Sequence, residues 1–341
     1  MDVKSATKAI RNGETAPIYV LYGTEKYQIQ QFTDMLKEQV IEEEHRDFAI
    51  IPYDLSETPV EVVIEEAETV PFLVPRKLII VRDASLFTAG KESKIDHQVD
   101  RLLTYMDNPA DYSTIVFLAQ GDKLDERKKL VKAVKKQAVV LAFAPLSGEE
   151  LLNWIVKLAK QRDVSFEAGA ADTLVSYAGT GLQTLSAEVD KLCLYAGNGG
   201  TIRRADIESL VARSTEQNVF ALVEELANLR LEKALGLFYE LLKQREEPIK
   251  IAALIARQFR IMIQVKELGQ QSYSQQQIAS QLGLHPYAVK IAGEQARKFQ
   301  PERLRNILSH LSELDYQMKT GAVDKVLGLE LFLLRLGATA S

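Results

Sequence analysis

The 341-residue chain is 46% apolar and 26% charged, with a net charge of −5. This globular composition and length suggest two or three domains. A protein that binds DNA on its own usually carries a basic excess, so the acidic balance argues that any nucleic acid is shared with partners. The longest strongly apolar stretch, 327–336, contains Glu330 and Arg335 and is too short to span a bilayer.

Cys193 is the only cysteine, which excludes an intrachain disulfide and fits a reducing cytoplasm. The first residues lack the apolar core of a signal peptide. The four histidines are scattered, and none has the spacing of a metal ligand. We therefore expect a cytoplasmic protein with no metal and no cofactor of its own.

The first block, residues 1–144, alternates two kinds of pattern. Short apolar, β-rich runs occupy 18–22, 48–53, 77–82, 114–119 and 139–143. Helical patterns separate them, and in one of these Val60, Val63, Ile64 and Ala67 recur at helical spacing. Continuous apolar runs alternating with helices predict an α/β domain with a mostly parallel five-stranded sheet.

The β signal fades after Pro145. Ser147 and Glu150 have the spacing of a capping box that opens a helix, and glycines at 179, 181 and 197–200 punctuate further helices. Residues 145–213 therefore predict a small helical domain. From 214 to 341 the pattern is long amphipathic helix, broken near 244–248, 269–274, 283–286 and 300–301, which predicts a third, all-helical domain.

A strand, a glycine and a helix around Gly23 raise the question of nucleotide binding. In a phosphate-binding loop, a second glycine, a lysine and a Ser/Thr complete the motif G-x-x-x-x-G-K-[ST]. Counted from Gly23, those three places hold Gln28, Ile29 and Gln30. Lys26 comes three positions too early, and Glu25 would repel a phosphate. The turn is preserved, but the groups that bind phosphate are not.

The run 78–81 is the candidate for a strand followed by an acidic pair that binds magnesium. Only Asp83 follows it, without a neighbouring carboxylate. Because the groups that position and neutralise the phosphates are missing, we expect no intrinsic ATPase activity.

An apolar tripeptide, Phe72-Leu73-Val74, lies between Pro71 and Pro75. The prolines stiffen the segment and prevent the preceding helix from continuing. Such a loop could present a docking plug to a partner. The residues themselves favour the alternative that the tripeptide folds back onto its own core, which is the commoner arrangement for large apolar residues.

Residues 274–298 have the pattern of a helix-turn-helix, with Gly283 at the turn and a second helix from Pro286. The second helix offers few base-reading side chains, namely Tyr287, Lys290 and Gln295. These helices could form a DNA-binding regulator or an ordinary helical pair, and the acidic chain favours the pair.

The run 123–136 contains seven basic and two acidic residues and could line a nucleic-acid channel. A solvated helix face with Leu130, Val131 and Val134 turned inward is the commoner arrangement. Cys193 and Tyr195, beside two leucines on a predicted helix, are expected in the core.

The whole chain resembles the delta-subunit family of the bacterial DNA polymerase III clamp loader. The resemblance runs through PIYVLYGTEKYQIQQF, PFLVPRKLIIVRDASLF, LDERKKLVKAVKK, NVFALVEELANLRLEKALGLFYELL and LSELDYQMKTG, in this order and spacing. It implies an AAA+-like α/β domain over 1–144, a helical lid over 145–213 and a helical collar over 214–341.

The resemblance also implies a function without intrinsic catalysis. The family's delta subunit lacks ATPase activity and belongs to the DNA polymerase III holoenzyme, a nucleotidyltransferase complex. Its collar is implied to join a five-subunit ring with delta prime and the tau/gamma ATPase subunits, which meets primer-template DNA as an assembly at the replisome. In the lid, Thr184 matches the place where an active AAA+ ATPase carries an arginine.

By this resemblance, the delta subunit binds the sliding clamp, the beta subunit, and opens one interface of the ring. An adjacent apolar pair after a helix of the first domain enters a pocket on the clamp. Phe72 and Leu73, aided by Val74, match that place at the end of the helix predicted over 59–69, although the family's typical order is Leu then Phe. The helix-turn-helix pattern then falls within the collar as a structural pair, and a DNA-binding regulator using 274–298 is the alternative function.

Overall fold

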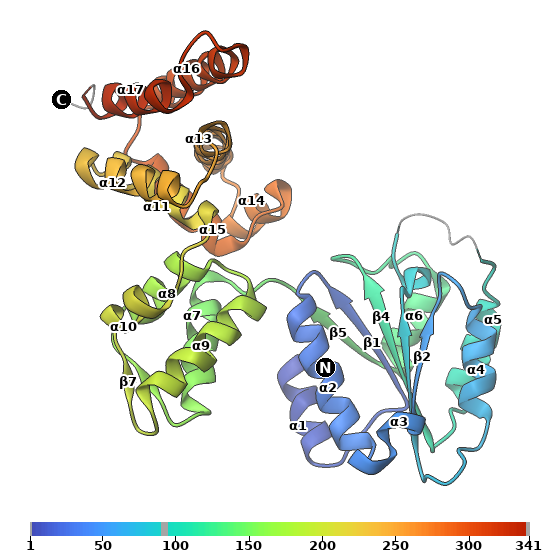
Figure 1. Cartoon of the computed structure of the whole chain (residues 1–341). Helices are drawn as coiled ribbons and strands as arrows, with labels where there is room; N and C mark the ends of the chain where they lie inside the picture. Colours follow the sequence, from blue (N-terminus) through green and yellow to red (C-terminus); the bar gives the residue numbers. More distant parts are fainter. Residues whose placement is uncertain (1, 90–94, 339–341) are drawn as a thin grey trace. The chain divides into compact units, whose positions relative to one another are not determined.

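The computed structural model describes residues 2–89 and 95–338, and the chain forms two compact units that divide between Pro145 and Leu146 (Figure 1). Each unit has its own hydrophobic core. Within the described residues, every helix falls short of the length or apolarity that crossing a membrane requires.

The first unit contains a five-stranded parallel sheet in the order β2-β3-β4-β1-β5. The strands are β1 (Ile18–Gly23), β2 (Ile50–Asp54), β3 (Lys77–Arg82), β4 (Ser113–Gln120) and β5 (Val139–Phe143). The predicted α/β class and the parallel sheet are confirmed. Three of the strands are fully buried along most of their length, which explains their continuous apolar runs.

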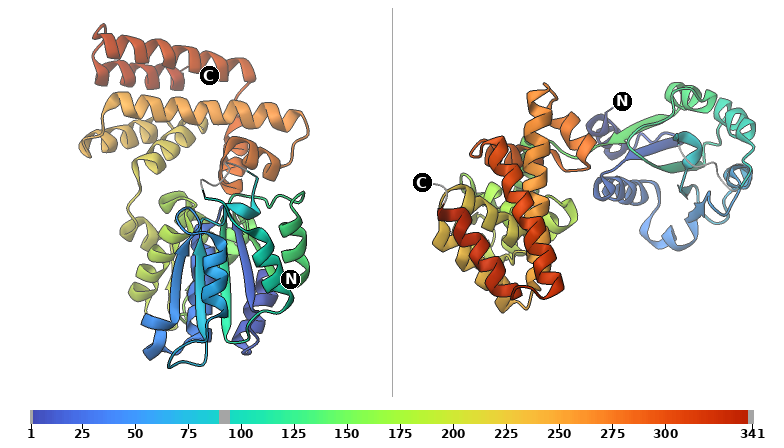
Figure 2. Two further views of the ribbon diagram at one scale, coloured as in Figure 1. Left: turned by 90° about the vertical axis from the view of Figure 1, so that its right-hand side faces the viewer. Right: turned by 90° about the horizontal axis from the view of Figure 1, so that it is seen from above.

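Helices cover both faces of this sheet (Figure 2). One face packs against α1 (Val3–Arg11), α2 (Lys26–Val40) and α3 (Arg46–Ala49), and the other against α4 (Val60–Glu68), α5 (Val99–Asp107) and α6 (Lys129–Gln137). Two short 3-10 turns, η1 (Glu43–His45) and η2 (Ser85–Phe87), complete the unit. Successive residues of a strand point to opposite faces of the sheet. In β3, Ile79 and Val81 therefore pack on the α4 side, and Leu78 and Ile80 pack on the α2 side.

The second strand begins later than predicted. Residues 46–49 form the single-turn helix α3, so β2 starts at Ile50 rather than at Phe48. Phe48 is exposed, and its ring lies 5.4 Å from that of His45. An aromatic residue beside two isoleucines suggests a strand in the sequence, but here its contact is with a neighbouring turn.

The second unit begins with α7 (Gly148–Lys160), β6 (Ser165–Phe166), α8 (Ala170–Ala178), α9 (Leu182–Ala196), β7 (Thr201–Ile202) and α10 (Arg204–Leu210). The predicted capping box is confirmed, since Ser147 and Glu150 each bind the other's backbone N–H. The two-residue parallel pair β6–β7 was not predicted, because two residues are too few to produce a periodic pattern.

In the described part of the chain, up to residue 338, seven helices follow and share one core: α11 (Thr215–Ala227), α12 (Leu231–Lys243), α13 (Pro248–Gln270), α14 (Gln275–Leu282), α15 (Pro286–Ala296), α16 (Pro301–Thr320) and α17 (Lys325–Ala338). The four predicted breaks all lie between helices. Two further breaks, at 228–230 and 321–324, were missed. A division of the second unit between residues 213 and 214 stays a prediction.

Candidate functional site

The segment 70–76 connects α4 to β3. All five strands are parallel, so a connection that enters β3 lies at the edge of the sheet where the strands begin (Figure 1). Gly23 ends β1 and therefore lies at the opposite edge. The two sequence features that suggest function are thus at different ends of the first unit.

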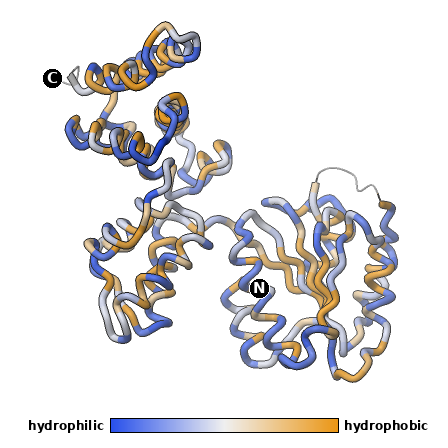
Figure 3. The backbone as a smooth tube through the Cα atoms, in the orientation of Figure 1, coloured by the Kyte–Doolittle hydropathy of each residue, from blue (hydrophilic) through white to orange (hydrophobic). Residues whose placement is uncertain are grey.

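Phe72 and Leu73 project from this loop into solvent, with exposed fractions of 82% and 77%. Val70 beside them is also exposed. Val74 differs, because it is partly buried and packs against the core on the α1 and α2 face of the sheet. The loop is hydrophobic in character, as Figure 3 shows for the connection beneath α4. Two of the three predicted plug residues therefore form an exposed apolar tip, and the third holds the loop to the unit.

The local sequence accounts for this conformation. Pro71 has no N–H to continue the helix, and both prolines restrict the residue before them. Leu73 has a φ of 63°, in the left-handed region that side chains other than glycine rarely adopt. A strained backbone at an exposed apolar tip is typical of a residue presented to a ligand or partner.

At the opposite edge of the sheet, the turn after β1, where a phosphate-binding loop would lie, packs directly against backbone. Gly23 has a φ of +135°, and a Cβ added to it would lie 2.0 Å from the carbonyl oxygen of Phe143. The backbone N–H of Glu25 donates to that same oxygen over 3.1 Å. Strand β1 ends at Gly23 and helix α2 begins at Lys26, so the connecting loop has only two residues. A phosphate-binding loop needs four residues between its two glycines.

The three positions that a phosphate loop would use lie inside α2. Ile29 packs against the core, and Gln30 donates to both carboxylate oxygens of Asp34 over 2.9 and 3.0 Å. Gln28 is partly buried on the same helix. Burial raises the pKa of Glu25 above its usual range. These observations agree with the expectation that the site does not bind phosphate, which itself stays a prediction.

The other two residues tested for nucleotide chemistry, Asp83 and Thr184, belong to different units. Asp83 follows β3 with a φ of 49°. Thr184 is exposed in the first turn of α9, in the second unit.

Among residues 2–89 and 95–338, one cluster could offer several ligand atoms to a metal ion. Glu42, Glu44 and His45 bring one ligand atom each within 4.8 Å of one another, but the carboxylates are exposed. Cys193 is buried, and burial raises the pKa of its thiol, with Arg162 lowering it and Asp190 raising it. The thiol is therefore protonated at neutral pH. Tyr195, predicted in the core, is 63% exposed, so that prediction was wrong.

The helix-turn-helix pattern folds as a pair of helices, α14 and α15, with Gly283 in the left-handed conformation at the turn. Two of its three supposed reading residues are buried, whereas Lys290 is exposed. Gln295 is 2% exposed and accepts a hydrogen bond from Gln258 of α13, and Tyr287 is 7% exposed.

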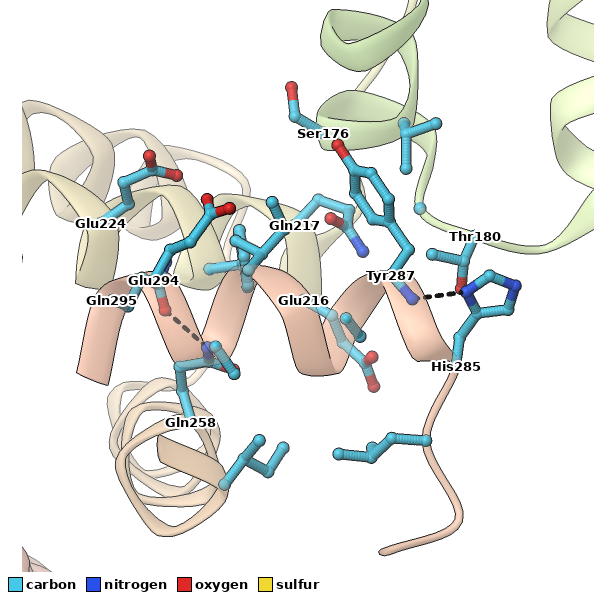
Figure 4. Close-up of a pocket in the computed structure, with 18 of the residues that line it drawn as sticks. Ser176, Thr180, Glu216, Gln217, Glu224, Gln258, His285, Tyr287, Glu294 and Gln295 are labelled. Atoms are coloured by element: carbon cyan, nitrogen blue, oxygen red, sulfur yellow. Dashed lines mark hydrogen bonds between the residues drawn. The ribbon is translucent and has the colours of Figure 1, made fainter. Parts of the chain in front are cut away.

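Figure 4 shows where α15 places these side chains, in a cavity of about 710 Å³ lined by α8, α11, α13 and α15. His285 accepts from the backbone N–H of Tyr287, and burial lowers the pKa of its imidazole. Burial and the nearby carboxylates of Asp172, Glu294 and Glu224 raise the pKa of Tyr287 to about 12. Two of the side chains that a DNA reader would expose, Tyr287 and Gln295, are instead packed within the second unit.

The basic run also has a structural explanation. Leu130, Val131 and Val134 are buried, as predicted for a solvated helix with an apolar inner face. Lys128 caps the carbonyls of Leu86 and Thr88 over 3.0 and 2.8 Å.

Matches to known proteins identify the family of this chain. Residues 19–144 match the family model described as DNA polymerase III, delta subunit, and residues 216–336 match that of the DNA polymerase III delta subunit, C-terminal domain. The DNA polymerase III subunit delta of Bacillus subtilis is 44% identical over 330 residues, which cover 96% of this chain and 95% of the relative. The chain belongs to the DNA polymerase III delta-subunit family.

One further relative and one solved structure agree. The probable DNA polymerase III subunit delta of Aquifex aeolicus is 23% identical, covering 93% of this chain and 90% of its own. The solved structure of the Bacillus subtilis DNA clamp loader delta protein superposes with a TM-score of 0.79 at 43% identity, covering 98% of this chain and 99% of the other. The fold is thus that of a clamp-loader delta subunit, and the alternative of a helix-turn-helix regulator is not supported.

Proposed function

We propose that this delta subunit binds the ring-shaped sliding clamp and opens one interface of the ring, so that the clamp can be loaded onto primed DNA. The observation that carries the proposal is the exposed pair Phe72–Leu73 at the tip of a proline-flanked loop. Large apolar side chains exposed side by side are uncommon on a monomer surface and are typical of docking sites. Membership of the delta-subunit family supports the clamp as the partner.

Burial of each apolar side chain in a pocket contributes roughly 1.5–3 kcal/mol before the costs of association. Phe72 and Leu73 therefore account for most of the affinity in this proposal. Val74 fixes the position of the loop by packing inward and contributes to binding indirectly.

Binding favours an open ring only if the open clamp is bound more tightly than the closed one. In this proposal the delta subunit supplies that difference in affinity without nucleotide. Its partners are the beta clamp, delta prime and the tau/gamma ATPase subunits in a heteropentamer, with residues 214–341 as the collar that joins them. Primer-template DNA is contacted by the assembled complex in the cytoplasm, at the replisome.

The proposal assigns ATP hydrolysis to the partner subunits. The closed turn at Gly23, the short connection to α2 and the pairing of Gln30 with Asp34 support a delta subunit that does not bind nucleotide. Titration with a fluorescent ATP analogue in the presence of magnesium is expected to give no saturable signal. Saturable binding would contradict this assignment.

The test of clamp docking is a surface plasmon resonance titration of the clamp, without nucleotide, that compares the wild type with Phe72→Ala/Leu73→Ala. We expect a loss of affinity of at least about 30-fold, equivalent to about 2 kcal/mol. Leu194→Ala/Tyr195→Ala is the matched control, because it removes another exposed adjacent apolar pair, from α9 in the other unit.

Equal affinity of the wild type and the Phe72/Leu73 variant would refute the docking site. Failure of the wild type to bind the clamp of its own organism would refute the function.

A further inference from the structure

The last turn of α4 is closed by side chains from elsewhere in the sheet. A helix leaves its final carbonyls without intrahelical partners, and these need other donors. The Tyr112 hydroxyl donates to the carbonyl oxygen of Glu68 over 2.7 Å, and the Ser113 hydroxyl donates to that of Ala67 over 2.7 Å. Ser113 is the first residue of β4 and Tyr112 directly precedes it, so both donors lie more than 40 residues further along the chain.

Lys77 completes the set at the first residue of β3. Its Nζ donates to the carbonyl oxygen of Glu66 and lies 2.9 Å from the Glu66 carboxylate. The lysine side chain is only 3% exposed, and a buried ammonium is costly unless it is fully paired. Lys77 is therefore held in one position by its contacts with Glu66.

These contacts fix both ends of the loop 70–76. Lys77 is where the loop enters the sheet, and Glu66 lies in the turn of α4 from which the loop departs. Lys77 also pairs with Ser113 in the register of β3 and β4, so the donors form one cluster beneath the end of α4. The spacing between the two ends of the loop is thereby set by buried hydrogen bonds.

We propose that Lys77, Tyr112 and Ser113 are positioning residues for clamp docking. They hold the end of α4 so that Phe72 and Leu73 are presented in the conformation that the clamp binds. An apolar tip fixed in advance loses less conformational freedom on binding, which increases affinity without any additional contact. This inference rests on the proposed function of the loop, and none of the three residues needs to touch the clamp.

The test uses the two smallest changes, Tyr112→Phe and Ser113→Ala, in the full-length chain. Each removes one hydroxyl and leaves no buried charge behind, so folding is preserved better than in a Lys77 variant. A lost hydrogen bond of ordinary strength corresponds to a fall in clamp affinity of about 3–10-fold, measured by surface plasmon resonance without nucleotide. Tyr273→Phe, at an exposed tyrosine in the second unit, is the control and is expected to bind as the wild type does.

A double-mutant cycle separates positioning from general loss of stability. In a Phe72→Ala background, Tyr112→Phe has less of the tip to position, so we expect its effect on affinity to shrink to less than about 2-fold. Equal losses in the wild-type and Phe72→Ala backgrounds would mean that the hydroxyl acts on the whole unit and would overturn the inference. Wild-type affinity of both hydroxyl variants would overturn it as well.

The wild type and Phe72→Ala/Leu73→Ala are measured in the same series. If the wild type does not bind, or if the pair variant binds equally well, the docking function fails and the positioning role fails with it. If those two proteins behave as proposed but the hydroxyl variants bind the clamp as tightly as the wild type, the positioning role alone is wrong.

Discussion

Gly23 lies against Phe143 so closely that a Cβ on the glycine would fall 2.0 Å from the Phe143 carbonyl oxygen. The backbone of Gly23 also has a φ of +135°, which residues other than glycine rarely adopt. The glycine that resembles the start of a phosphate loop is thus required by the packing of β1 against β5. Its presence needs no ligand to explain it.

Gly23→Ala is expected to lower the stability of the first unit by about 2–4 kcal/mol, because backbone rather than a flexible side chain must move. Thermal unfolding followed by circular dichroism measures this change. Gly121→Ala is the matched control, since it has a similar φ of +115° but its added Cβ would lie 3.8 Å from the nearest side-chain atom. Equal destabilisation by both variants would show that φ alone, and not the contact with Phe143, requires glycine.

Glu25 predicts a pH dependence of stability. Burial raises its pKa above 4.5 in the folded state, so the folded protein holds this proton more tightly than the unfolded chain does. The buried charge of Glu25 therefore lowers the free energy of unfolding by its full amount at neutral pH. This destabilisation disappears as the pH falls through the pKa of Glu25 in the folded state and below its pKa in the unfolded chain. Glu25→Gln is expected to raise the unfolding temperature by about 1–3 °C at pH 7 and to have little effect at pH 3.5.

The control for that comparison is Glu38→Gln, an exposed position on the same helix. A gain for Glu25→Gln that persists unchanged at pH 3.5 would mean that the charge of Glu25 is not its cause.

The sequence was sufficient to predict the features that depend on local periodicity. The continuous apolar runs identified the five parallel strands, and the spacing from Val60 to Ala67 identified α4. Two prolines marked the loop at Phe72. The break at 321–324 was missed although it contains Gly321. The break at 228–230 contains no glycine or proline and was missed, because Leu229 adopts a left-handed φ of 61° between α11 and α12. Nothing local distinguishes such a leucine from a helical one.

Features that depend on tertiary contacts could not be predicted from the sequence. Val74 and Leu73 are alike in apolarity, yet one packs inward and the other is exposed, because the fold of the loop decides. Tyr195 follows core residues on the same helix but faces solvent. The donors that close α4 could not be predicted either, because Tyr112 and Glu68 are far apart in the sequence and meet only in the folded unit.

Val74→Ala tests the division of roles within the loop. Because Val74 packs against its own core and fixes the loop, we expect a loss of stability of about 1 kcal/mol and a fall in clamp affinity of about 2–3-fold, well short of the fall for Leu73→Ala. Thermal unfolding and the plasmon resonance titration measure the two effects on the same sample. Val70→Ala, in the exposed part of the loop, is expected to leave the unfolding temperature unchanged. A Val74 variant that unfolds normally but binds as weakly as Leu73→Ala would make Val74 a direct contact.

Tyr287 tests whether α15 is a structural helix or a DNA reader. The ring is nearly buried and comes within 3.3 Å of where a Cβ on Gly148 of α7 would lie. Tyr287→Ala is therefore expected to destabilise the second unit by about 3 kcal/mol, as measured by chemical denaturation. Lys290→Ala, at an exposed position of the same helix, is expected to have no such effect. Sequence-specific, salt-sensitive binding of duplex DNA by the isolated chain, lost in Lys290→Ala, would contradict the structural role and make α15 a reading helix.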